Sequence, residues 1–475
     1  MPLRAASCRI GLAIARRASA GAGTATLLLA LPAVAAAETA QESARAAPET
    51  APPNYLRPAF ETALGLAAAS VWYWVDDRNV FDWDRPSLEQ RLNGEAWRFD
   101  NNTFALNFLW HPLAGGGLYV LARGNRLSVP VSFLYSLAGS TLWEYVIEFK
   151  EKVSINDMLI TPIAGLPLGE FFHKLAEYLS SVPPRTAAQH ALVWSLGLSV
   201  HGHRSLDGIE PAPASRVDRL GYASPLFSRF SFYYGFGQTA RFGSAASSTH
   251  VIGARGKLVS LPGYLTPDSF GRWFHRADVT TLELELGASE HGVGGDLFSE
   301  AIVGGYHAQS LAFSGERPSG AFATTGVAVA YRYRDDPSFG FDDRQGFMHA
   351  PGLAVDLGAA GRRRHARLEL RSYLSFGGMS NTTRSAAAWE AREGRTKTVL
   401  ERWGYSFGYG STSSAQASLG LGSFELRGGV GVTAYRSIQG LDRTQENVEE
   451  DVVVTELARD YTASAWLAPP ATPLK

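Results

Sequence analysis

Residues 366–376 read Ala-Arg-Leu-Glu-Leu-Arg-Ser-Tyr-Leu-Ser-Phe, and apolar and polar side chains alternate along this stretch. Successive side chains of a strand point to opposite faces of a sheet, so one face here is apolar and the other is charged. The alternation recurs in about eleven or twelve segments of roughly ten residues each after residue 190. Further examples are 192–200, 230–236, 282–286 and 403–409.

The length of these segments favours a membrane barrel. A strand of about 9–11 residues crosses a bilayer, and its lipid-facing side must be apolar. Every backbone group must also be paired inside lipid, so the sheet must close on itself. We therefore predict an antiparallel transmembrane β-barrel of about 12 strands over residues 190–475. A soluble β-sandwich or a lipocalin-like barrel also alternates and is the alternative.

The C-terminal end of the sequence lacks a feature that is usual in such barrels. Outer-membrane barrels usually finish on a strand with a terminal aromatic residue, whereas this sequence ends in Trp466-Leu467-Ala468-Pro469-Pro470 and five further residues. We expect either that the barrel is incomplete at the C-terminus or that its closure is unusual.

The N-terminus predicts export. Four arginines, an apolar run from Ala25 to Ala37 and the small residues Ala35 to Ala37 form the pattern of a cleaved signal peptide over residues 1–37. Residues 38–58 are rich in Ala, Glu, Thr and Pro and predict a flexible leader. The only cysteine, Cys8, lies in the signal. Disulfides, a thiolate nucleophile and a cysteine metal site are therefore excluded from the exported chain.

The charge of the exported chain argues against one class of partner. The whole sequence has a net charge of −1. Loss of the four signal-peptide arginines brings the charge to about −5, which argues against a nucleic-acid-binding protein.

The segment 59–182 predicts a helical domain, separated from the strands by Ser180 to Pro184. Helices are expected near 60–73, 104–121, 131–150 and 168–179. Within this apolar segment, polar residues share helix faces at spacings of three and four. These residues are Asn107, His111, Arg123, Glu144, Glu148, Asp157, Glu170 and His173.

The helical segment also resembles a known family. The motifs that carry the resemblance lie between about residues 80 and 185 and include Asn107 to Pro112, Ser140 to Tyr145, Ser154 to Asp157 and Gly165 to Glu170. Their combination is similar to the bacterial family of domain of unknown function 3943. The resemblance implies a Gram-negative envelope protein with a signal, this helical block and a strand-rich tail, and it implies no activity.

Three interpretations of the polar set remain open, and one of them is a binding site for a ligand or a lipid headgroup. The other two assign roles to particular residues. In the first, Asn107, Arg123, Glu144, Glu148, Asp157, Glu170 and His173 form a buried structural network, with Arg123 paired to Glu144 or Glu148. In the second, His111, Glu144, Glu148 and Asp157 form a catalytic or cation site. His201 and His203, which we expect on one strand face near Asp207, are weak metal candidates. We expect no cofactor.

Three functional hypotheses follow. The leading one is a non-enzymatic outer-membrane barrel whose helical block plugs the barrel or supports it at the periplasmic side. The alternatives are an outer-membrane enzyme acting on lipid or glycan through the His/Glu/Asp set, and a small-solute pore. All three place the protein in the bacterial outer membrane after signal cleavage. The expected partners are the lipid bilayer and the barrel-assembly machinery.

Overall fold

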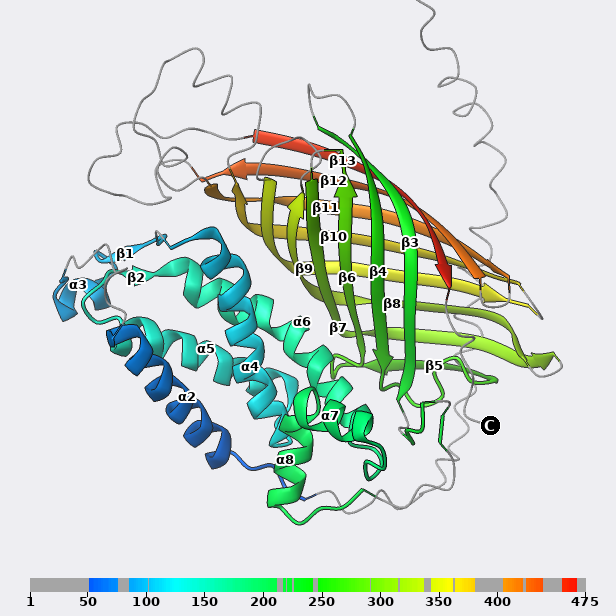
Figure 1. Ribbon diagram of the computed structural model, residues 1–475, viewed down its shortest axis with the longest axis horizontal. Helices are drawn as coiled ribbons and strands as arrows, with labels where there is room; N and C mark the ends of the chain where they lie inside the picture. The colour runs from blue at the N-terminus through cyan, green and yellow to red at the C-terminus, as the bar shows by residue number, and fades with distance from the viewer. Residues whose placement is uncertain are drawn as a thin grey trace, which may run out of the picture.

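The computed structural model describes residues 51–75, 85–100, 102–211, 217–218, 220–223, 226–241, 247–290, 292–314, 317–336, 343–361, 364–380, 405–421, 424–438 and 455–467. The predicted signal peptide and most of the predicted leader lie outside these residues. Within them, the chain has the expected α+β organisation, with a helical block followed by a curled antiparallel sheet (Figure 1).

The helical block consists of α-helices, two π-helical turns at Leu106–Trp110 and Trp143–Ile147, and one short parallel strand pair. The strands of that pair are β1 (Trp97–Arg98) and β2 (Val153–Ser154). The helices are α2 (Leu56–Val75), α3 (Leu88–Asn93), α4 (His111–Gly124), α5 (Val129–Leu142), α6 (Ile155–Leu179), α7 (Ala187–Ser195) and α8 (Leu198–Leu206).

The centre of the block is α6, most of whose residues are buried. The sequence predicted a helix only from about residue 168, after the prolines at 162 and 167. Instead α6 begins at Ile155, where the Ser154 hydroxyl accepts a hydrogen bond from the Asp157 amide, and it continues through Pro162 and Pro167. Packing against α4 and α5 outweighs the loss of two backbone donors.

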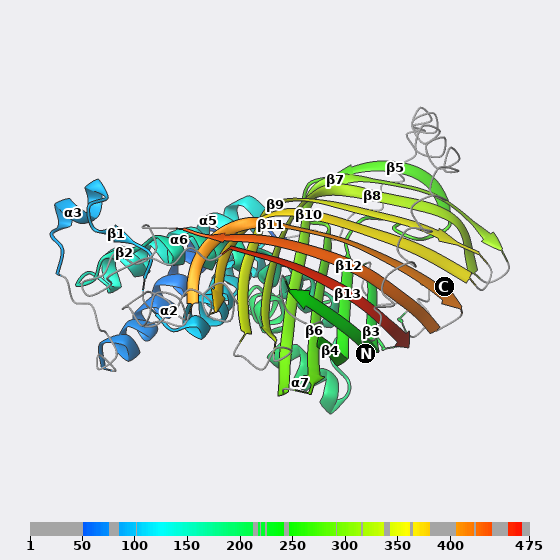
Figure 2. The same ribbon diagram turned by 90° about the horizontal axis from the view of Figure 1, so that it is seen from above.

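Eleven strands form one sheet. They are β3 (Phe227–Arg241), β4 (Ser247–Val259), β5 (Asp268–Phe274), β6 (Val279–Ser289), β7 (Gly292–Ser314), β8 (Arg317–Asp336), β9 (Asp343–Ala360), β10 (Arg364–Ser380), β11 (Tyr405–Leu421), β12 (Phe424–Ser437) and β13 (Thr455–Leu467). The predicted barrel of about twelve strands is thus close to the observed number. Figure 2 shows how strongly the sheet curls.

The strand pairings close into a ring. One edge of β7 pairs with β8, and its other edge pairs with β6 along its first half and with β5 along its second half. The last strand, β13, pairs with the first strand of the sheet, β3. All pairings are antiparallel. The seam joins Ala458–Leu467 of β13 to 232–241 of β3, so the ladder closes without a terminal aromatic residue. Of the two expectations for the C-terminal end, unusual closure is the one that the described strands fit.

The helical block packs on the outside of the curled sheet. The Phe171 ring of α6 lies over Gly256 of β4, where a Cβ atom would stand 2.7 Å from the ring. The flanking residues Arg255 and Lys257 point the other way and pair with acidic residues across the interior. Since side chains alternate along a strand, Phe171 contacts the outer face. Figures 1 and 2 both show the helices beside the strands.

The far end of the block makes the same kind of contact. The Phe108 ring lies over Gly346 of β9 and Gly378 of β10. The outward-facing Tyr331 of β8 donates a hydrogen bond to the Phe108 carbonyl. The prediction that the helical block plugs the barrel is therefore wrong, because the block is bound to the outer wall.

Residues 192–200 form helices where the sequence predicted a strand. The alternation of Leu192, Trp194 and Leu196 suggested a strand, but α7 and α8 occupy this segment and the first barrel strand begins at Phe227. A capping box begins α7, because the side chains of Thr186 and Gln189 each accept a hydrogen bond from the other residue's backbone amide. This local signal outweighed a short alternating pattern.

Candidate functional site

The buried polar groups of the helical block form two separate centres. The first, which we call the carboxylate centre, comprises Asp100, Glu144 and Asp157 with Asn107, Asn156 and His111. The second, the arginine centre, comprises Arg123 and Glu170 with Tyr119, Lys174 and His173. Both centres use α6, which carries Asn156 and Asp157 in its first turn and Glu170 to Lys174 further along.

Asp100 is the hydrogen-bonding hub of the carboxylate centre. Its Oδ1 accepts hydrogen bonds from the Asn107 amide at 2.5 Å and from the Asn156 amide at 3.1 Å. Its backbone N–H donates to Asn156 Oδ1 at 2.8 Å. Asn156 also donates to Asp157 Oδ1 at 2.8 Å, so one amide bridges two buried carboxyl groups.

Glu144 closes the other side of the carboxylate centre. It lies in the π-helical turn that follows α5, and its Oε2 accepts a hydrogen bond from the Ser154 backbone amide at 2.8 Å. Glu148 is half-buried nearby, where its Oε1 accepts a hydrogen bond from the Trp143 indole at 2.7 Å. Burial and the adjacent Glu151 raise the pKa of Glu148 to about 8. Burial and Glu148 also raise the pKa of Glu144 above its usual range.

His111 and Asp157 face each other across the α4–α6 contact. His111 Nε2 lies 3.6 Å from Asp157 Oδ1. Burial and the neighbouring Asp100 raise the pKa of Asp157, whereas burial lowers the pKa of His111. The surroundings therefore favour the protonated form of the Asp157 carboxyl group and the neutral form of the His111 imidazole. An acid and a base whose environments shift their pKa values in opposite directions are an arrangement that enzymes use for proton transfer.

The arginine centre is an ion-pair cluster around the Glu170 carboxylate. Arg123 Nε lies 2.7 Å from Glu170 Oε2, and Lys174 Nζ lies 3.3 Å from Glu170 Oε1. The Tyr119 hydroxyl donates to the same Glu170 carboxylate at 2.7 Å. Although burial acts to raise it, Arg123 and Lys174 hold the pKa of Glu170 at about 2. Burial and Arg123 lower the pKa of His173 to about 4.

The predicted structural network is thus divided, and one pairing in it is wrong. Arg123 pairs with Glu170 and not with Glu144 or Glu148, because α4 packs along α6. Asn107, Glu144, Asp157 and, at the margin, Glu148 belong to the carboxylate centre, while Glu170 and His173 belong to the arginine centre. The four catalytic candidates His111, Glu144, Glu148 and Asp157 do lie in one region of the block.

The histidine pair at 201 and 203 is also different from the prediction. Both residues lie on α8, not on a strand. His203 Nε2 lies 2.8 Å from Glu61 Oε1, while the His201 ring packs edge-on against Trp194. Asp207 pairs instead with Arg57 and Arg126. Within the residues that the structure describes, no group of three or more His, Cys, Asp or Glu side chains is placed to hold a metal ion.

Several site residues escaped the sequence reasoning. Asp100 and Asn156 were not candidates, although both are central to the carboxylate centre. Lys174 stands four residues after Glu170, a spacing that predicts an i,i+4 ion pair. Asp100 had no such signal, because a short parallel strand pair, β1 with β2, positions it beside α6.

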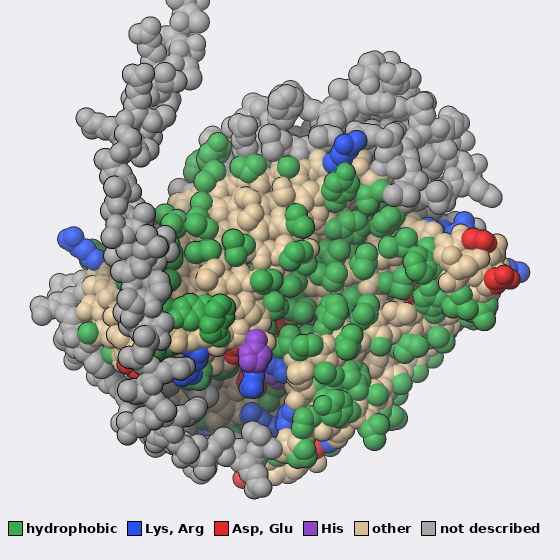
Figure 3. All heavy atoms as spheres, turned by 180° about the vertical axis from the view of Figure 1, so that it is seen from behind, with side chains coloured by type: hydrophobic (Ala, Val, Ile, Leu, Met, Phe, Trp, Pro, Cys, Tyr) green, Lys and Arg blue, Asp and Glu red, His purple; other side chains and the backbone are tan. Residues whose placement is uncertain are grey.

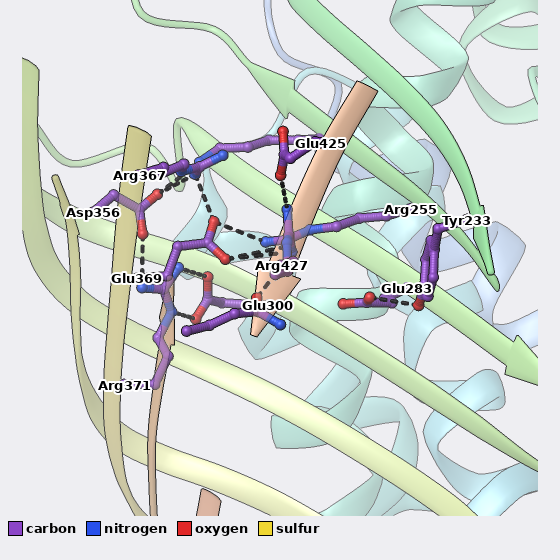
Figure 4. Close-up of polar contacts among 12 residues, drawn as sticks. Tyr233, Arg255, Glu283, Glu300, Asp356, Arg367, Glu369, Arg371, Glu425 and Arg427 are labelled. Carbon is purple, nitrogen blue, oxygen red and sulfur yellow. Dashed lines mark hydrogen bonds and ion pairs between the residues drawn. The ribbon is translucent and has the colours of Figure 1, made fainter. Parts of the chain in front are cut away.

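A third polar cluster fills the interior of the barrel (Figure 4). The Glu369 carboxylate of β10 accepts two hydrogen bonds from Arg255 of β4, both at 3.1 Å, and one oxygen lies 2.7 Å from Arg367. Arg371 of β10 pairs with Glu300 of β7 and with Asp356 of β9. Because β4 and β10 are not neighbours in the ring, the Arg255–Glu369 pair must cross the interior.

Part of the chain between β4 and β5 also lies in the interior of the barrel. Tyr264 from this connection packs against His307 and Phe322 on the inner face of the wall. Gln309 fixes the connection by donating hydrogen bonds to the carbonyls of Gly263 at 3.0 Å and Thr266 at 2.6 Å. Side chains and a folded-in segment thus occupy the lumen where the structure describes it.

Comparisons with known proteins bear mainly on the helical block. No curated protein sequence matches the chain. Among solved structures, the chain is similar to OmpT (in-vitro folded), an outer membrane protein of Vibrio cholerae, with 7% sequence identity and a TM-score of 0.16 over 54% of this chain and 100% of that chain. A TM-score this low carries no weight for fold or function. The model of the family described as Domain of unknown function (DUF3943) matches residues 96–197, which confirms the family resemblance of the helical block.

Proposed function

We propose that this protein is a non-conducting outer-membrane barrel whose outer wall carries the helical block. The proposal depends on one observation, the distribution of side chains on the two faces of the sheet. On β12, the side chain of Leu426 is 54% exposed on the outer face, while its neighbour Arg427 is 6% exposed and paired inside. A water-soluble antiparallel sheet would carry polar residues on its exposed face and apolar residues inside.

The inverted distribution extends around the barrel. Exposed apolar side chains occur on the outer face of most strands, and Figure 3 shows them spread over the wall opposite the helices. They include Phe232, Ile252, Leu286, Val327, Leu353, Leu374, Leu419 and Leu426. An apolar outer band with a polar interior is the arrangement of transmembrane barrels, in which the outer side chains meet lipid.

The filled lumen argues against the small-solute pore. Arg255 and Arg367 pair with Glu369. Asp356 pairs with both Arg367 and Arg371, and Arg371 pairs with Glu300, so the ion pairs are continuous across the interior. Buried pairs of this kind are costly to break, because each partner would be left as an uncompensated charge. We infer that the barrel serves as an anchor and platform in the membrane and not as a passive channel.

Purified full-length protein would test both parts of this proposal. In the native barrel we expect faster migration on a detergent gel before heating than after, and no stepwise conductance when the protein is inserted into planar lipid bilayers. Recovery of the exported protein in the soluble fraction of the envelope would overturn the membrane assignment. Steady conductance steps would overturn the sealed lumen while leaving the membrane assignment intact.

Barrel closure implies a further partner. The first and last strands, β3 and β13, must meet to form the seam, so an unclosed intermediate would expose two strand edges. We infer that the barrel-assembly machinery of the outer membrane handles this intermediate. Depletion of that machinery should reduce the amount of heat-modifiable protein; an unchanged amount would contradict the inference.

A second candidate function is acid–base hydrolysis of a lipid or glycan at the carboxylate centre. The observation that favours it is the contact between His111 and Asp157, with opposite pKa shifts, 3.6 Å apart. The His111 side chain is 17% exposed, so the pair is close to the surface of the block. His111 would accept a proton from an attacking water, and the protonated Asp157 would donate one to the leaving group.

Phospholipid vesicles and peptidoglycan fragments are suitable probes for this second function. If the centre is catalytic, Asp157→Asn and His111→Gln should retain the native unfolding transition and abolish product release, with Glu177→Gln as an active control. If the centre is structural, native protein should release no product and the same variants should unfold more easily.

A further inference from the structure

The outermost helix of the block, α2, has an unusual distribution of side chains. Every exposed residue of α2 is apolar or glycine: Leu56, Ala59, Phe60, Ala63, Leu64, Gly65, Ala67, Ala68, Val71, Trp72 and Val75. Its charged residues and Tyr73 have their partners in the block. Arg57 pairs with Asp207, Glu61 with His203, and the Tyr73 hydroxyl donates to Glu151. A helix on the surface of a soluble protein has the opposite arrangement.

The neighbouring helix α5 repeats this arrangement. Ser132, Ser136 and Ser140 are buried at spacings of four, and Ser136 is fully buried while Leu134 is 56% exposed. The Ser136 hydroxyl donates to the Gly115 carbonyl of α4 at 3.0 Å, and the Ser140 hydroxyl donates to the Asp157 carbonyl of α6 at 3.0 Å. The exposed positions are Pro130, Leu134, Ala138 and Leu142.

The contacts between helices inside the block are made by small residues. At the crossing of α4 and α6, Gly115 faces Gly165 so closely that a Cβ on Gly165 would stand 2.5 Å from the Gly115 carbonyl carbon. Small residues that let helix backbones approach, with hydroxyl groups that bond between helices, are typical of helix contacts in lipid. Two helices thus bury polar and small residues and expose apolar ones.

The position of the block identifies what covers this apolar surface. The block is bound to the outer wall of the barrel, where the strands beyond it expose leucine, valine and aromatic side chains. The apolar surface of the strands therefore continues onto the helices. Figure 1 shows α2 and α5 on the side of the block away from the strands. None of the described helices is long and apolar enough to cross a bilayer.

We propose that the outer face of α2 and α5 is a lipid-contact surface, so that the helical block is seated in the acyl-chain region beside the barrel. This inference rests on the proposed membrane location of the barrel. Its occupant is the acyl chains of the membrane lipids. A lipid environment removes the cost of exposing apolar side chains and makes the burial of serine, glutamate and arginine favourable for holding the helices together.

Site-directed spin labelling would test the proposal, because the sequence has a single cysteine, Cys8, which would first be removed by Cys8→Ser. Single cysteines would be introduced as Leu64→Cys on α2 and Leu134→Cys on α5 of the full-length protein. Leu374→Cys on the outer face of β10 would serve as the barrel reference, and Glu89→Cys on α3 as the water reference. After reconstitution into phosphatidylethanolamine–phosphatidylglycerol vesicles, label collisions with oxygen and with a water-soluble nickel chelate would be measured.

The proposal expects the labels at Leu64 and Leu134 to behave like the label at Leu374, with high oxygen and low chelate accessibility. Chelate accessibility equal to that at Glu89 would place the helices in water and overturn it. Low accessibility to both reagents with dipolar broadening would show that a second copy covers the surface, which would also overturn it. If Leu374 itself is chelate-accessible, the proposed barrel location fails first, so the two failures are distinguishable.

Discussion

At the scale of single residues, the two centres of the helical block favour opposite protonation states of their buried carboxyl groups. In the arginine centre, cations surround the Glu170 carboxylate and favour its charged form. In the carboxylate centre, burial and the neighbouring acidic groups raise the pKa of Asp157 and favour its protonated form. The arginine centre therefore serves to hold helices together, whereas the carboxylate centre retains groups that can exchange protons near neutral pH.

Removing the charge of Glu170 tests the structural role of the arginine centre. Glu170→Gln would leave Arg123 and Lys174 buried without their shared counter-charge, and we expect a loss of about 3–5 kcal/mol in the free energy of unfolding. Glu177→Gln, on the same helix but partly exposed, should cost at most about 1 kcal/mol. Denaturant unfolding of the reconstituted protein measures both. Equal losses in the two variants would contradict a specific role for Glu170.

The same residue sets a dependence on acidic pH. The pKa of Glu170 is held at about 2 in the folded chain, below its usual value. The ionised Glu170 therefore contributes to the free energy of unfolding at pH values above the ordinary pKa of a glutamate. This contribution is lost as the pH falls toward 2.

Glu148 predicts the opposite dependence at higher pH. The pKa of Glu148 is raised to about 8 in the folded chain. Its contribution to the free energy of unfolding is therefore fully present below the ordinary pKa of a glutamate. We expect the free energy of unfolding to decrease as the pH rises from about 4.5 to 8. In this range Glu148 ionises in the unfolded chain but remains protonated in the folded chain. Glu148→Gln should flatten this part of the curve of unfolding free energy against pH. A curve that is unchanged in the variant would show that another group titrates there.

At the scale of elements, the contact between α4 and α6 holds the block together. A Cβ on Gly115 would stand 1.9 Å from the Thr161 carbonyl oxygen, whereas a Cβ on Gly117, two residues later, would meet nothing within 4 Å. The α4 backbone can therefore approach α6 only where glycine faces it. This close approach also brings His111 of α4 to Asp157 of α6.

These two glycines form a matched pair for substitution. Gly115→Ala should force the helices apart and destabilise the protein by about 1–3 kcal/mol or more. Gly117→Ala should be neutral or stabilise by up to about 1 kcal/mol, because alanine is the better helix former. Thermal unfolding followed by circular dichroism would separate them. If both variants are stabilised alike, the close contact between α4 and α6 is absent.

At the scale of the whole molecule, the barrel has an apolar outside, a charged inside and a helical block on one wall. Leu374 of β10 lies on the outer face and is exposed, while Tyr373 beside it points inward to Glu300. Leu374→Arg should cost about 2–4 kcal/mol in lipid vesicles if this face meets the bilayer interior. Leu374→Ala is the control for lost side-chain volume. An arginine variant as stable as the alanine variant would place this face in water.

The sequence by itself determined the local features of this protein. Period-two alternation in segments such as 366–376 predicted the strands, their two faces and the barrel, because strand geometry fixes which side chains share a face. The apolar pattern of residues 59–182 predicted a helical domain, and the motifs between about residues 80 and 185 predicted the family whose model matches residues 96–197. Spacings of three and four indicated polar groups such as Glu170 and His173 that share a helix face.

Only the tertiary structure decided how these parts meet. The pairing of β13 with β3 depends on the register around the whole ring, and a terminal motif does not report it. The partner of Arg123 depends on the crossing of α4 and α6, and the inclusion of Asp100 depends on β1 pairing with β2. The position of the helical block on the outer wall depends on long-range packing of Phe108 and Phe171 against glycines of the strands. Contacts between residues far apart in sequence leave no periodic pattern, so the sequence could not show them.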